Sequence, residues 1–272
     1  MITAVGTALS EDLLPLGDLT ASLVPTSAQV EATFAARESG TVAGSACVIE
    51  TYAQLDDRVR VEWLVADGEA FEPGAVVAVV TGPLAPVLTG ERTALNFLRH
   101  LSGVASLTRR FVDLATAASG GRTRILDTRK TTPGLRALEK AAVRAGGGFN
   151  HRANLSDAIM VKDNHLAGLS IADAVARARA LWPGRPVHVE CDTLDQLDAI
   201  LATGADRAMV DNFSPADVAV AVERVGARLE LEVTGGVTLD TVAAYAEAGP
   251  DFISVGALTQ SAGVVDLGLD LK

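Results

Sequence analysis

The sequence predicts an α/β protein with an incomplete, TIM-like βα-barrel domain and a smaller N-terminal α+β sandwich domain. From residue 125 onward, short β-rich runs alternate with amphipathic helical segments. The last four runs end at Glu190, Asp211, Thr234 and Gly256, with spacings of 21, 23 and 22 residues. Such alternation is typical of parallel strands joined by right-handed helical crossovers. Several units of this kind favour a barrel over an open doubly wound sheet. No GxGxxG motif follows an early strand, which weakens the dinucleotide-binding alternative.

Residues 1–103 are expected to form the smaller domain and residues 104–261 the barrel. The C-terminal tail, residues 262–272, is expected to pack with the smaller domain. From the N-terminus, we expect a helix at 9–14, a turn at 17–20, a weakly alternating segment at 30–37, a buried helix or strand at 41–50, and strands at 59–65 and 75–80.

Residues 89–101 have the features of a helix. Thr89 can cap the first turn, Glu91 places a negative charge near the positive end of the helix dipole, and apolar residues follow at helical spacing. Gly103 is expected to end or kink this helix, and a second helix is expected at 104–118.

The turns and valine-rich run at residues 67–82 resemble the small β-sandwich of lipoyl and biotinyl carriers. Such carriers need a lysine at a hairpin tip, and residues 1–129 contain none. A carrier role is therefore disfavoured, and a structural role for this segment is expected.

In the barrel, each expected strand is a short β-rich run and each expected helix is amphipathic. The strands are expected at 125–127, 158–162, 187–190, 207–211, 229–234 and 252–256, and the helices at 171–181, 194–202, 215–225 and 239–248.

The composition is that of an ordinary globular protein, with 49% hydrophobic and 21% charged residues. A formal net charge of -11 argues against nucleic-acid or anionic-membrane partners, which need a broad basic surface. Cys47 and Cys191 have no metal-ligand spacing, so two buried free thiols are favoured over a disulfide. The sequence shows no secretory signal and no apolar run of about 18 residues that could span a bilayer. We therefore expect a cytoplasmic protein.

One stretch departs from this acidic average. Residues 122–152 include eight arginines and lysines and two acidic residues, a local balance of +6. A solvated helix face normally interleaves both signs, so this run favours a pocket for a strongly anionic small molecule.

The ends of the expected strands carry the residues that could do chemistry, because a βα-barrel builds its active site at the C-terminal ends of its strands. These residues are Asp127, Arg129, Lys130, Lys162, Glu190, Asp211, the run Thr234, Gly235 and Gly236, and the pair Gly256 and Ala257.

The glycine-bearing loops after the last two strands, at residues 234–236 and 256–257, predict a phosphate site. Glycine allows backbone N–H groups to approach the anion closely. In the alternative interpretation these glycines only turn the chain.

Glu190 and Asp211 end apolar strands, where a buried carboxylate is costly without a cation or hydroxyl nearby. Mg²⁺ on a phosphorylated substrate, or ribose hydroxyls, would satisfy both. Salt bridges to Lys162 or Arg152 are the alternative. A Schiff-base role for Lys162 also stays open, since desolvated barrel lysines perform this chemistry.

His151 follows three glycines and precedes Arg152. This context favours binding of a carboxylate over a purely structural role. His100 and His188 have no such context, and His165 is expected only to support its loop.

Motifs along nearly the whole chain occur in a familiar order and spacing. They are GDLT at 17–20, ERTALN at 91–96, DTRKTTPGLR at 127–136, GGGFNHR at 146–152, VKDNH at 161–165, DNF at 211–213, TGG at 234–236 and SVGALT at 254–259. Together they strongly resemble the quinolinate phosphoribosyltransferase family.

The resemblance implies that quinolinate and phosphoribosyl pyrophosphate react, with Mg²⁺, to give nicotinate mononucleotide, pyrophosphate and CO₂ in de novo NAD synthesis. It also implies a homodimer, with assembly beyond the dimer open. The implied quinolinate-binding residues are Arg92 from the partner subunit, Arg129, His151, Arg152 and Lys162. The implied residues for the phosphoribosyl donor are Lys130, Glu190, Asp211, Thr234, Gly235, Gly236, Gly256, Ala257 and Gln260, with Glu190 and Asp211 serving the metal partly through the donor or water.

In the implied reaction, Lys130, Lys162, Glu190 and Asp211 are the catalytic residues. Carboxylates near the ribose and Mg²⁺ on the departing pyrophosphate favour positive character at the anomeric carbon. The substrates are positioned by cations, and no side-chain nucleophile is required. Whether Lys130 or Lys162 protonates the ring carbon stays open.

The chain departs from the family at Gln260, where the family usually has histidine. Glutamine can donate a hydrogen bond but carries no positive charge. We expect a weaker or less pH-dependent contact to phosphate groups, with the reaction intact.

Four alternatives remain. A paralogue associated with molybdenum transport has a similar fold, but that group lacks the element found here at 162–165. A nicotinate-using transferase would leave several cations unpaired. A lyase using a Lys162 Schiff base and a non-catalytic binding module are further alternatives; the module would not explain Glu190 and Asp211.

Overall fold

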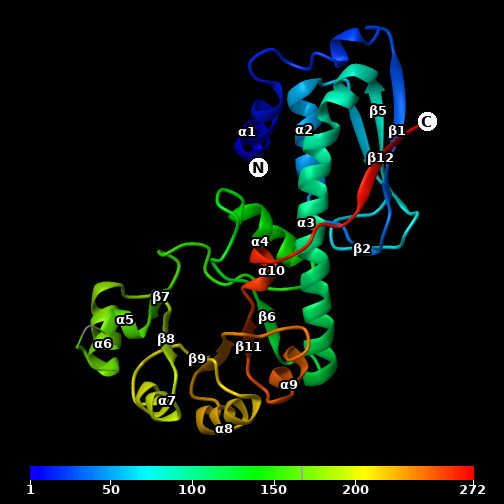
Figure 1. The fold of residues 1–272 in the computed structure, drawn as a ribbon. Coiled ribbons are helices and arrows are strands. Elements are labelled where there is room, and N and C mark those ends of the chain that lie inside the picture. Colours follow the sequence, from blue (N-terminus) through cyan, green and yellow to red (C-terminus); the bar gives the residue numbers. More distant parts are fainter. Residues whose placement is uncertain (167) are drawn as a thin grey trace. The chain divides into compact units, whose positions relative to one another are not determined.

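The computed structural model describes residues 1–166 and 168–272 (Figure 1). The chain forms two compact units, and each is described by itself. The first unit contains Met1–Arg109, Thr131–Gly147 and Thr259–Lys272, and the second contains Arg110–Lys130 and Gly148–Leu258. No helix in the described part of the chain is long and apolar enough to cross a membrane.

The first unit is built on an antiparallel sheet with the strand order β12-β1-β5-β3. Phe34 and Val80 from the sheet pack with Tyr52 and Leu98 from two helices in one buried core. The strands are β1 (Gln29–Ala36), β3 (Arg60–Trp63), β5 (Val76–Pro83) and β12 (Leu267–Leu271), and a separate short pair joins β2 (Gly40–Thr41) to β4 (Ala70–Phe71).

The C-terminal tail supplies an edge strand of this sheet. β12 pairs with β1 from Ala36 opposite Leu267 to Ala32 opposite Leu271. The tail expected to pack with the smaller domain thus hydrogen-bonds to its first strand.

The helices of the first unit differ in two places from the expected ones. The first helix is longer than residues 9–14, because Val5 and Leu9, four residues apart, both bury their side chains. In the segment 41–50, which could be helix or strand, a helix begins at Ser45. The helices are α1 (Ile2–Leu13), the 3-10 helix η1 (Ala21–Leu23), α2 (Ser45–Leu55), the part of α3 (Leu84–Ser119) that precedes Arg110, and α4 (Arg136–Ala145).

The expectation of two helices separated at Gly103 was wrong, because α3 is one helix of 36 residues. It passes through the position of the expected boundary after residue 103. Thr89 lies inside the helix and donates to Oδ2 of Asp18 at 2.9 Å instead of capping it. Gly103 is required by packing, since a Cβ there would overlap the carbonyl oxygen of Gly263.

The second unit contains six parallel strands in the order β6-β11-β10-β9-β8-β7. This parallel sheet with its helical crossovers confirms the TIM-like barrel architecture predicted from the spacing of the strand ends. The strands are β6 (Arg124–Leu126), β7 (Ile159–Val161), β8 (Val187–Cys191), β9 (Arg207–Asp211), β10 (Glu230–Thr234) and β11 (Phe252–Ser254). The helices are α5 (Asp163–Leu166), α6 (Ile171–Leu181), α7 (Leu194–Leu201), α8 (Pro215–Val225), α9 (Val242–Glu247) and α10 (Ala257–Gln260), which ends in the first unit.

The two faces of this sheet differ in chemistry. Strand residues such as Val189, Val210 and Val233 are buried and apolar, and α6, α7 and α8 pack against the strands (Figure 1). The alternate positions carry most of the polar side chains of these strands, together with Met160, Met209 and Phe252. Register partners in parallel strands point to one face, so these side chains form rows across the sheet. One row is Met160, His188, Arg207 and Glu230, the next is Glu190, Met209, Glu232 and Phe252, and the third includes Asp211 and Thr234.

Replacing Gly103 with alanine should destabilise the protein by about 1–3 kcal/mol, because the new methyl group would displace the backbone at Gly263. Free energies of unfolding from urea denaturation measure this loss. Gly6→Ala is the matched control within α1, since its Cβ would meet only the flexible end of Gln54 at 3.2 Å. This control should be neutral or stabilising by up to about 1 kcal/mol. Equal stability of the two variants would contradict the packing role of Gly103.

Candidate active site

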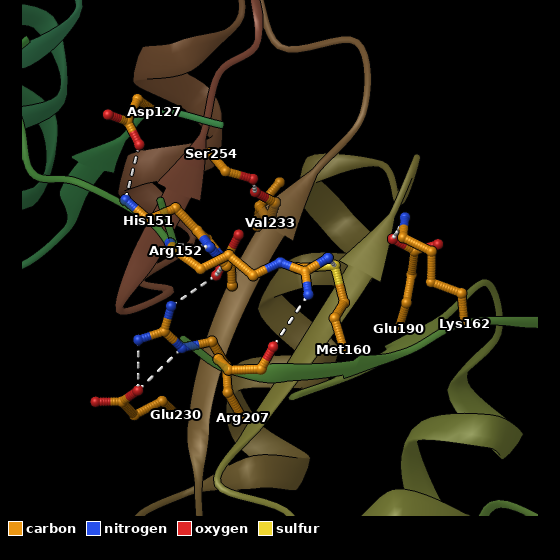
Figure 2. Close-up of polar contacts among 12 residues, drawn as sticks. Asp127, His151, Arg152, Met160, Lys162, Glu190, Arg207, Glu230, Val233 and Ser254 are labelled. Atoms are coloured by element: carbon orange, nitrogen blue, oxygen red, sulfur yellow. Dashed lines mark hydrogen bonds and ion pairs between the residues drawn. The ribbon is translucent and has the colours of Figure 1, made fainter. Parts of the chain in front are cut away.

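The C-terminal ends of β7 and β8 carry an ion pair. Met160 and His188 are register partners, so Lys162 and Glu190, two residues later, face the same side. Nζ of Lys162 lies 2.5 Å from Oε2 of Glu190 (Figure 2). The salt bridge expected as one alternative for Glu190 is therefore present. The Lys162 side chain keeps 39% of its surface exposed, so its ammonium can donate to a further acceptor.

The loops that follow β9 and β10 lie in contact with one another. Asp211 and Thr234 are register partners, and the backbone N–H of Asn212 donates to the carbonyl of Thr234 at 3.0 Å. Gly235 has φ of +85°, and a Cβ there would collide with the side chains of Asp211 and Asn212. Glycine is thus required at this position, and it places the loop backbone beside the Asp211 carboxylate.

Lys130 and Gly256, which follow the neighbouring strands β6 and β11, come together. A Cβ at Gly256 would lie 2.9 Å from Cδ of Lys130, so the lysine stem runs directly over the glycine. The backbone N–H of Lys130 donates to Oγ1 of Thr128 at 3.0 Å, which fixes the preceding turn. An ammonium group beside a glycine-bearing loop suits a phosphate group. Ala257, the next residue, begins α10.

Arg152 is held with its guanidinium group partly buried. Nη1 donates to the carbonyl of Ala158 at 3.0 Å, and Nη2 lies 3.3 Å from the sulfur of Met160 (Figure 2). Burial, followed by the positive charge of Arg129, lowers the pKa of Arg152, and Asp157 offsets only part of this effect. An anion bound at this guanidinium would oppose that decrease.

Asp127 organises the loop that carries His151 and Arg152. It is fully buried, and its carboxylate accepts a hydrogen bond from the backbone N–H of His151 at 2.8 Å (Figure 2). It also accepts one from the side-chain amide of Asn150 at 2.6 Å. Phe149 continues the sheet as a parallel bridge to Leu126. Asp127 therefore holds the loop in place.

The His151 ring points into the protein, with its side chain 5% exposed. Nδ1 accepts a hydrogen bond from the backbone N–H of Arg152 at 2.7 Å, and Nε2 lies 3.3 Å from Oε2 of Glu232. The ring also contacts His188 edge-on, with centroids 5.5 Å apart.

Three residues around His151 were missed in the sequence: His188, Arg207 and Glu232. Glu232 is fully buried and accepts a hydrogen bond from Nη1 of Arg207 at 2.8 Å. Burial opposes ionisation of Glu232, but His151 and Arg207 outweigh it and lower the pKa of this carboxyl group. Polar residues at every second position of β8 and β10 were a usable signal, since they identify the polar face.

Arg92 and Gln260 belong to the first unit, and both are exposed. Arg92 lies on α3, and Gln260 is the last residue of α10. Sequence context did not single out His100. Its Nε2 lies 2.8 Å from Oε1 of the buried Glu139, within hydrogen-bonding distance. Glu139 in turn accepts the backbone N–H of Thr132 at 3.0 Å, so this histidine supports the loop before α4.

Cys47 and Cys191 are buried free thiols, as expected. Burial raises the pKa of Cys47 to about 11 and that of Cys191 to about 12. Both thiols are protonated at neutral pH, so neither is suited to nucleophilic catalysis.

No group of three or more His, Cys, Asp and Glu side chains among residues 1–166 and 168–272 could hold a metal ion. The strand-end carboxylates of Glu190 and Asp211 are hard oxygen ligands that fit only part of a Mg²⁺ coordination shell.

Two family models match the chain: the quinolinate phosphoribosyl transferase N-terminal domain at residues 18–102 and the C-terminal domain at residues 104–270. A nicotinate-nucleotide pyrophosphorylase [carboxylating] from Mycobacterium leprae is 42% identical, over 97% of this chain and 94% of that protein. A probable enzyme of the same name from Bacillus subtilis is 41% identical, over 94% and 88%. The solved nicotinate-nucleotide pyrophosphorylase from Francisella tularensis superposes with a TM-score of 0.95 at 39% identity, covering 100% of this chain and 95% of that one.

His188 should stay neutral in the folded protein well below pH 7. Burial, and then the charge of Arg207, lowers its pKa from 6.5 to about 4. Between these values the unfolded chain binds a proton here that the folded chain does not, so stability should fall as the pH decreases. Between pH 7 and 4.5, the free energy of unfolding should fall about 2 kcal/mol more for the wild type than for His188→Gln, as measured by urea denaturation. Equal losses would mean that folded His188 is protonated.

Proposed function

The chain belongs to the quinolinate phosphoribosyltransferase family, and we propose that it transfers the phosphoribosyl group of phosphoribosyl pyrophosphate to quinolinate with loss of CO₂. The products are nicotinate mononucleotide, pyrophosphate and CO₂, a step of de novo NAD synthesis. The observation that carries the proposal is the match of both domain models of this family, at residues 18–102 and 104–270. Quinolinate, a pyridine with two adjacent carboxylates, can accept hydrogen bonds from Arg152, whose guanidinium is held by Ala158 and Met160, and from Arg129.

Lys162 completes the acceptor site in this proposal. Its ammonium group has three N–H donors, so it can keep its contact with Glu190 and donate to a quinolinate carboxylate. Arg129, Arg152 and Lys162 would then place three cations around the two carboxylates of quinolinate. Nicotinate has a single carboxylate, so this arrangement would favour quinolinate.

The phosphoribosyl donor is assigned to the neighbouring strand ends. Lys130 over Gly256, and the backbone of Gly235 and Gly236, face the phosphate groups, while Asp211 serves the ribose hydroxyls. The remaining donor-site residues carried over from the family are Glu190, Thr234, Ala257 and Gln260. At Gln260 a neutral side chain stands where the family has histidine, so its contact to phosphate lacks the ionic component.

Mg²⁺ is the proposed cofactor. Glu190 and Asp211 would hold it partly through water, and the donor's oxygens would complete the shell that the chain leaves incomplete. When bound, Mg²⁺ would supply positive charge to the departing pyrophosphate.

In the proposed reaction, the pyridine nitrogen forms a bond to the anomeric carbon while the bond from that carbon to the pyrophosphate oxygen breaks. The leaving electron pair goes to pyrophosphate, and the ring nitrogen becomes positively charged. The bond between C2 and its carboxylate then breaks, CO₂ departs, and the electron pair left on C2 is stabilised by the adjacent positive nitrogen. Lys130 and Lys162 are the ammonium groups available to return a proton to C2. Arg129 and Arg152 contribute by orienting the ring.

Arg92 is proposed to enter the site from the partner subunit of a homodimer. Its exposure on α3 supports this assignment, because an exposed guanidinium on a helix surface can reach another chain. A cytoplasmic location is also proposed, since that compartment keeps Cys47 and Cys191 reduced.

The proposed function is tested by incubating the protein with Mg²⁺, phosphoribosyl pyrophosphate and either quinolinate or nicotinate. We expect CO₂ and nicotinate mononucleotide from quinolinate only. Arg129→Ala and Arg152→Ala should each raise the KM for quinolinate about a hundredfold or more, the loss of a charge-assisted contact to a carboxylate. Circular dichroism should show an unchanged fold.

Arg177→Ala, which removes an exposed arginine from α6, is the control and should leave the KM unchanged. Turnover of nicotinate alone would overturn the assignment. A near-normal KM in either Arg129→Ala or Arg152→Ala would show that the anion binds elsewhere.

The role of Arg92 is tested by complementation between subunits. At a quinolinate concentration near the wild-type KM, Arg92→Ala and Arg129→Ala should each show almost no activity alone, but in a hybrid dimer one site would receive intact copies of both residues. Co-expression of the two variants should therefore restore about a quarter of wild-type activity, because random pairing makes half of the dimers hybrid. If Arg92 serves its own subunit, the mixture will remain inactive.

A further inference from the structure

We infer that Asn212 is a positioning residue for Asp211, because its side-chain amide fixes the Asp211 carboxylate relative to the glycine loop at 234–236. Asn212 is the middle residue of the DNF motif at 211–213, and the proposed function uses only the first of these three residues. The geometry of the inference stands on the contacts of this turn alone. Its kinetic part rests on the proposed function, in which Asp211 serves the ribose hydroxyls of the donor.

The backbone of Asn212 has a left-handed conformation, with φ of +56°. In the part of the chain that the structure describes, no other residue except glycine has a positive φ. This conformation brings Cβ close to the following carbonyl oxygen, and asparagine tolerates it better than most residues because its short polar side chain can form local hydrogen bonds. A strained backbone persists only where surrounding contacts hold it, and such residues concentrate at functional sites.

Contacts on both sides of Asn212 hold this conformation. Its backbone N–H donates to the carbonyl of Thr234 at 3.0 Å. The next residue, Phe213, is buried, and its carbonyl accepts a hydrogen bond from the Tyr245 hydroxyl at 2.9 Å. Ser214 then caps the first turn of α8 with its hydroxyl. The turn is therefore held in one conformation, and the direction of the Asn212 side chain is held with it.

The Asn212 amide lies between the Asp211 carboxylate and the glycine loop. Nδ2 donates to Oδ2 of Asp211 at 2.9 Å. Oδ1 lies over Gly235, where a Cβ would be 2.4 Å away, and 3.8 Å from the position of a Cβ at Gly236. One side chain thus reaches both the carboxylate at the end of β9 and the glycine loop after β10.

This arrangement gives the Asp211 carboxylate a defined orientation. Oδ2 accepts from Asn212, and Oδ1 lies on the side of the glycine loop, 2.5 Å from the position of a Cβ at Gly235. A hydrogen bond to a charged acceptor is stronger than one between neutral groups, so the carboxylate keeps this orientation before the donor binds. A carboxylate that is already oriented binds a hydroxyl group without first losing rotational freedom.

The first test compares crystal structures of Asn212→Gly and the wild type, both without substrates. Glycine keeps the left-handed backbone at no steric cost and removes the amide. We expect the backbone of residues 211–214 to superpose, while the Asp211 carboxylate adopts a different rotamer or several. An Asp211 carboxylate that keeps its wild-type orientation would overturn the inference. This comparison needs no turnover, so it holds whichever substrates the site takes.

The second test separates the amide from the backbone conformation by steady-state kinetics with Mg²⁺, phosphoribosyl pyrophosphate and quinolinate. Asn212→Gly loses only the amide, whereas Asn212→Ala also strains the left-handed backbone. We expect Asn212→Gly to raise the KM for phosphoribosyl pyrophosphate about tenfold, as for the loss of one hydrogen bond to a charged group, with the KM for quinolinate within about twofold. Asn212→Ala should raise the KM for phosphoribosyl pyrophosphate at least as much.

Ser214→Ala is the control in the same turn. It removes the hydroxyl that caps α8 and keeps the Asn212 amide, so both KM values should stay unchanged. A near-normal KM for phosphoribosyl pyrophosphate in Asn212→Gly, or an equal rise in the KM of both substrates, would contradict a positioning role. Asn212→Gly decides alone if Asn212→Ala does not fold. Absence of quinolinate turnover in the wild type would instead contradict the proposed function.

Discussion

Neutralisation of charges on the inner face of the parallel sheet is the constraint on which the second unit depends. Valines occupy the opposite face, so polar side chains are confined to alternate positions of each strand. A charge there is tolerated only when a partner of opposite sign or a hydrogen-bond donor reaches it. Arg207 and Glu232 satisfy one another in this way, and Lys162 and Glu190 do so nearer the strand ends. The same alternation that builds the sheet therefore also supplies a rigid support for the candidate site.

The net charge of -11 does not conflict with a site for anionic substrates. At physiological ionic strength the field of an exposed charge is screened over about 8 Å, whereas partly buried charges are screened much less. Arg129, Arg152 and Lys130 lie close to the strand ends, so their local field decides what binds there.

The sequence was sufficient to predict the parts of the fold with a regular period. The spacing of strand ends identified the barrel, and the polar residues at those ends included Lys162 and Glu190, which form an ion pair. The sequence was not sufficient where a contact between residues far apart in the chain determines the local structure. Gly103 has the local signature of a helix end, but the reason for this glycine is the approach of residue 263, which no local pattern contains.

The chemistry of His151 shows a second limit. Its neighbours along the chain, three glycines and an arginine, favour a binding role, but they do not reveal that its ring lies beside Glu232 and His188, some 40 to 80 residues away. The alternation of polar residues along β8 and β10 was visible in the sequence but was interpreted only at the strand ends. The catalytic assignments themselves stay proposals carried by the family resemblance and the geometry of the strand ends.

The pairing of β12 with β1 has a consequence for synthesis of the protein. β1 is made early, but its partner at Leu267–Leu271 is translated only after the whole barrel. Until then one edge of the first sheet presents unpaired backbone groups, which are a template for wrong pairing between chains. The nascent chain therefore carries an open strand edge until residues 267–271 have been synthesised.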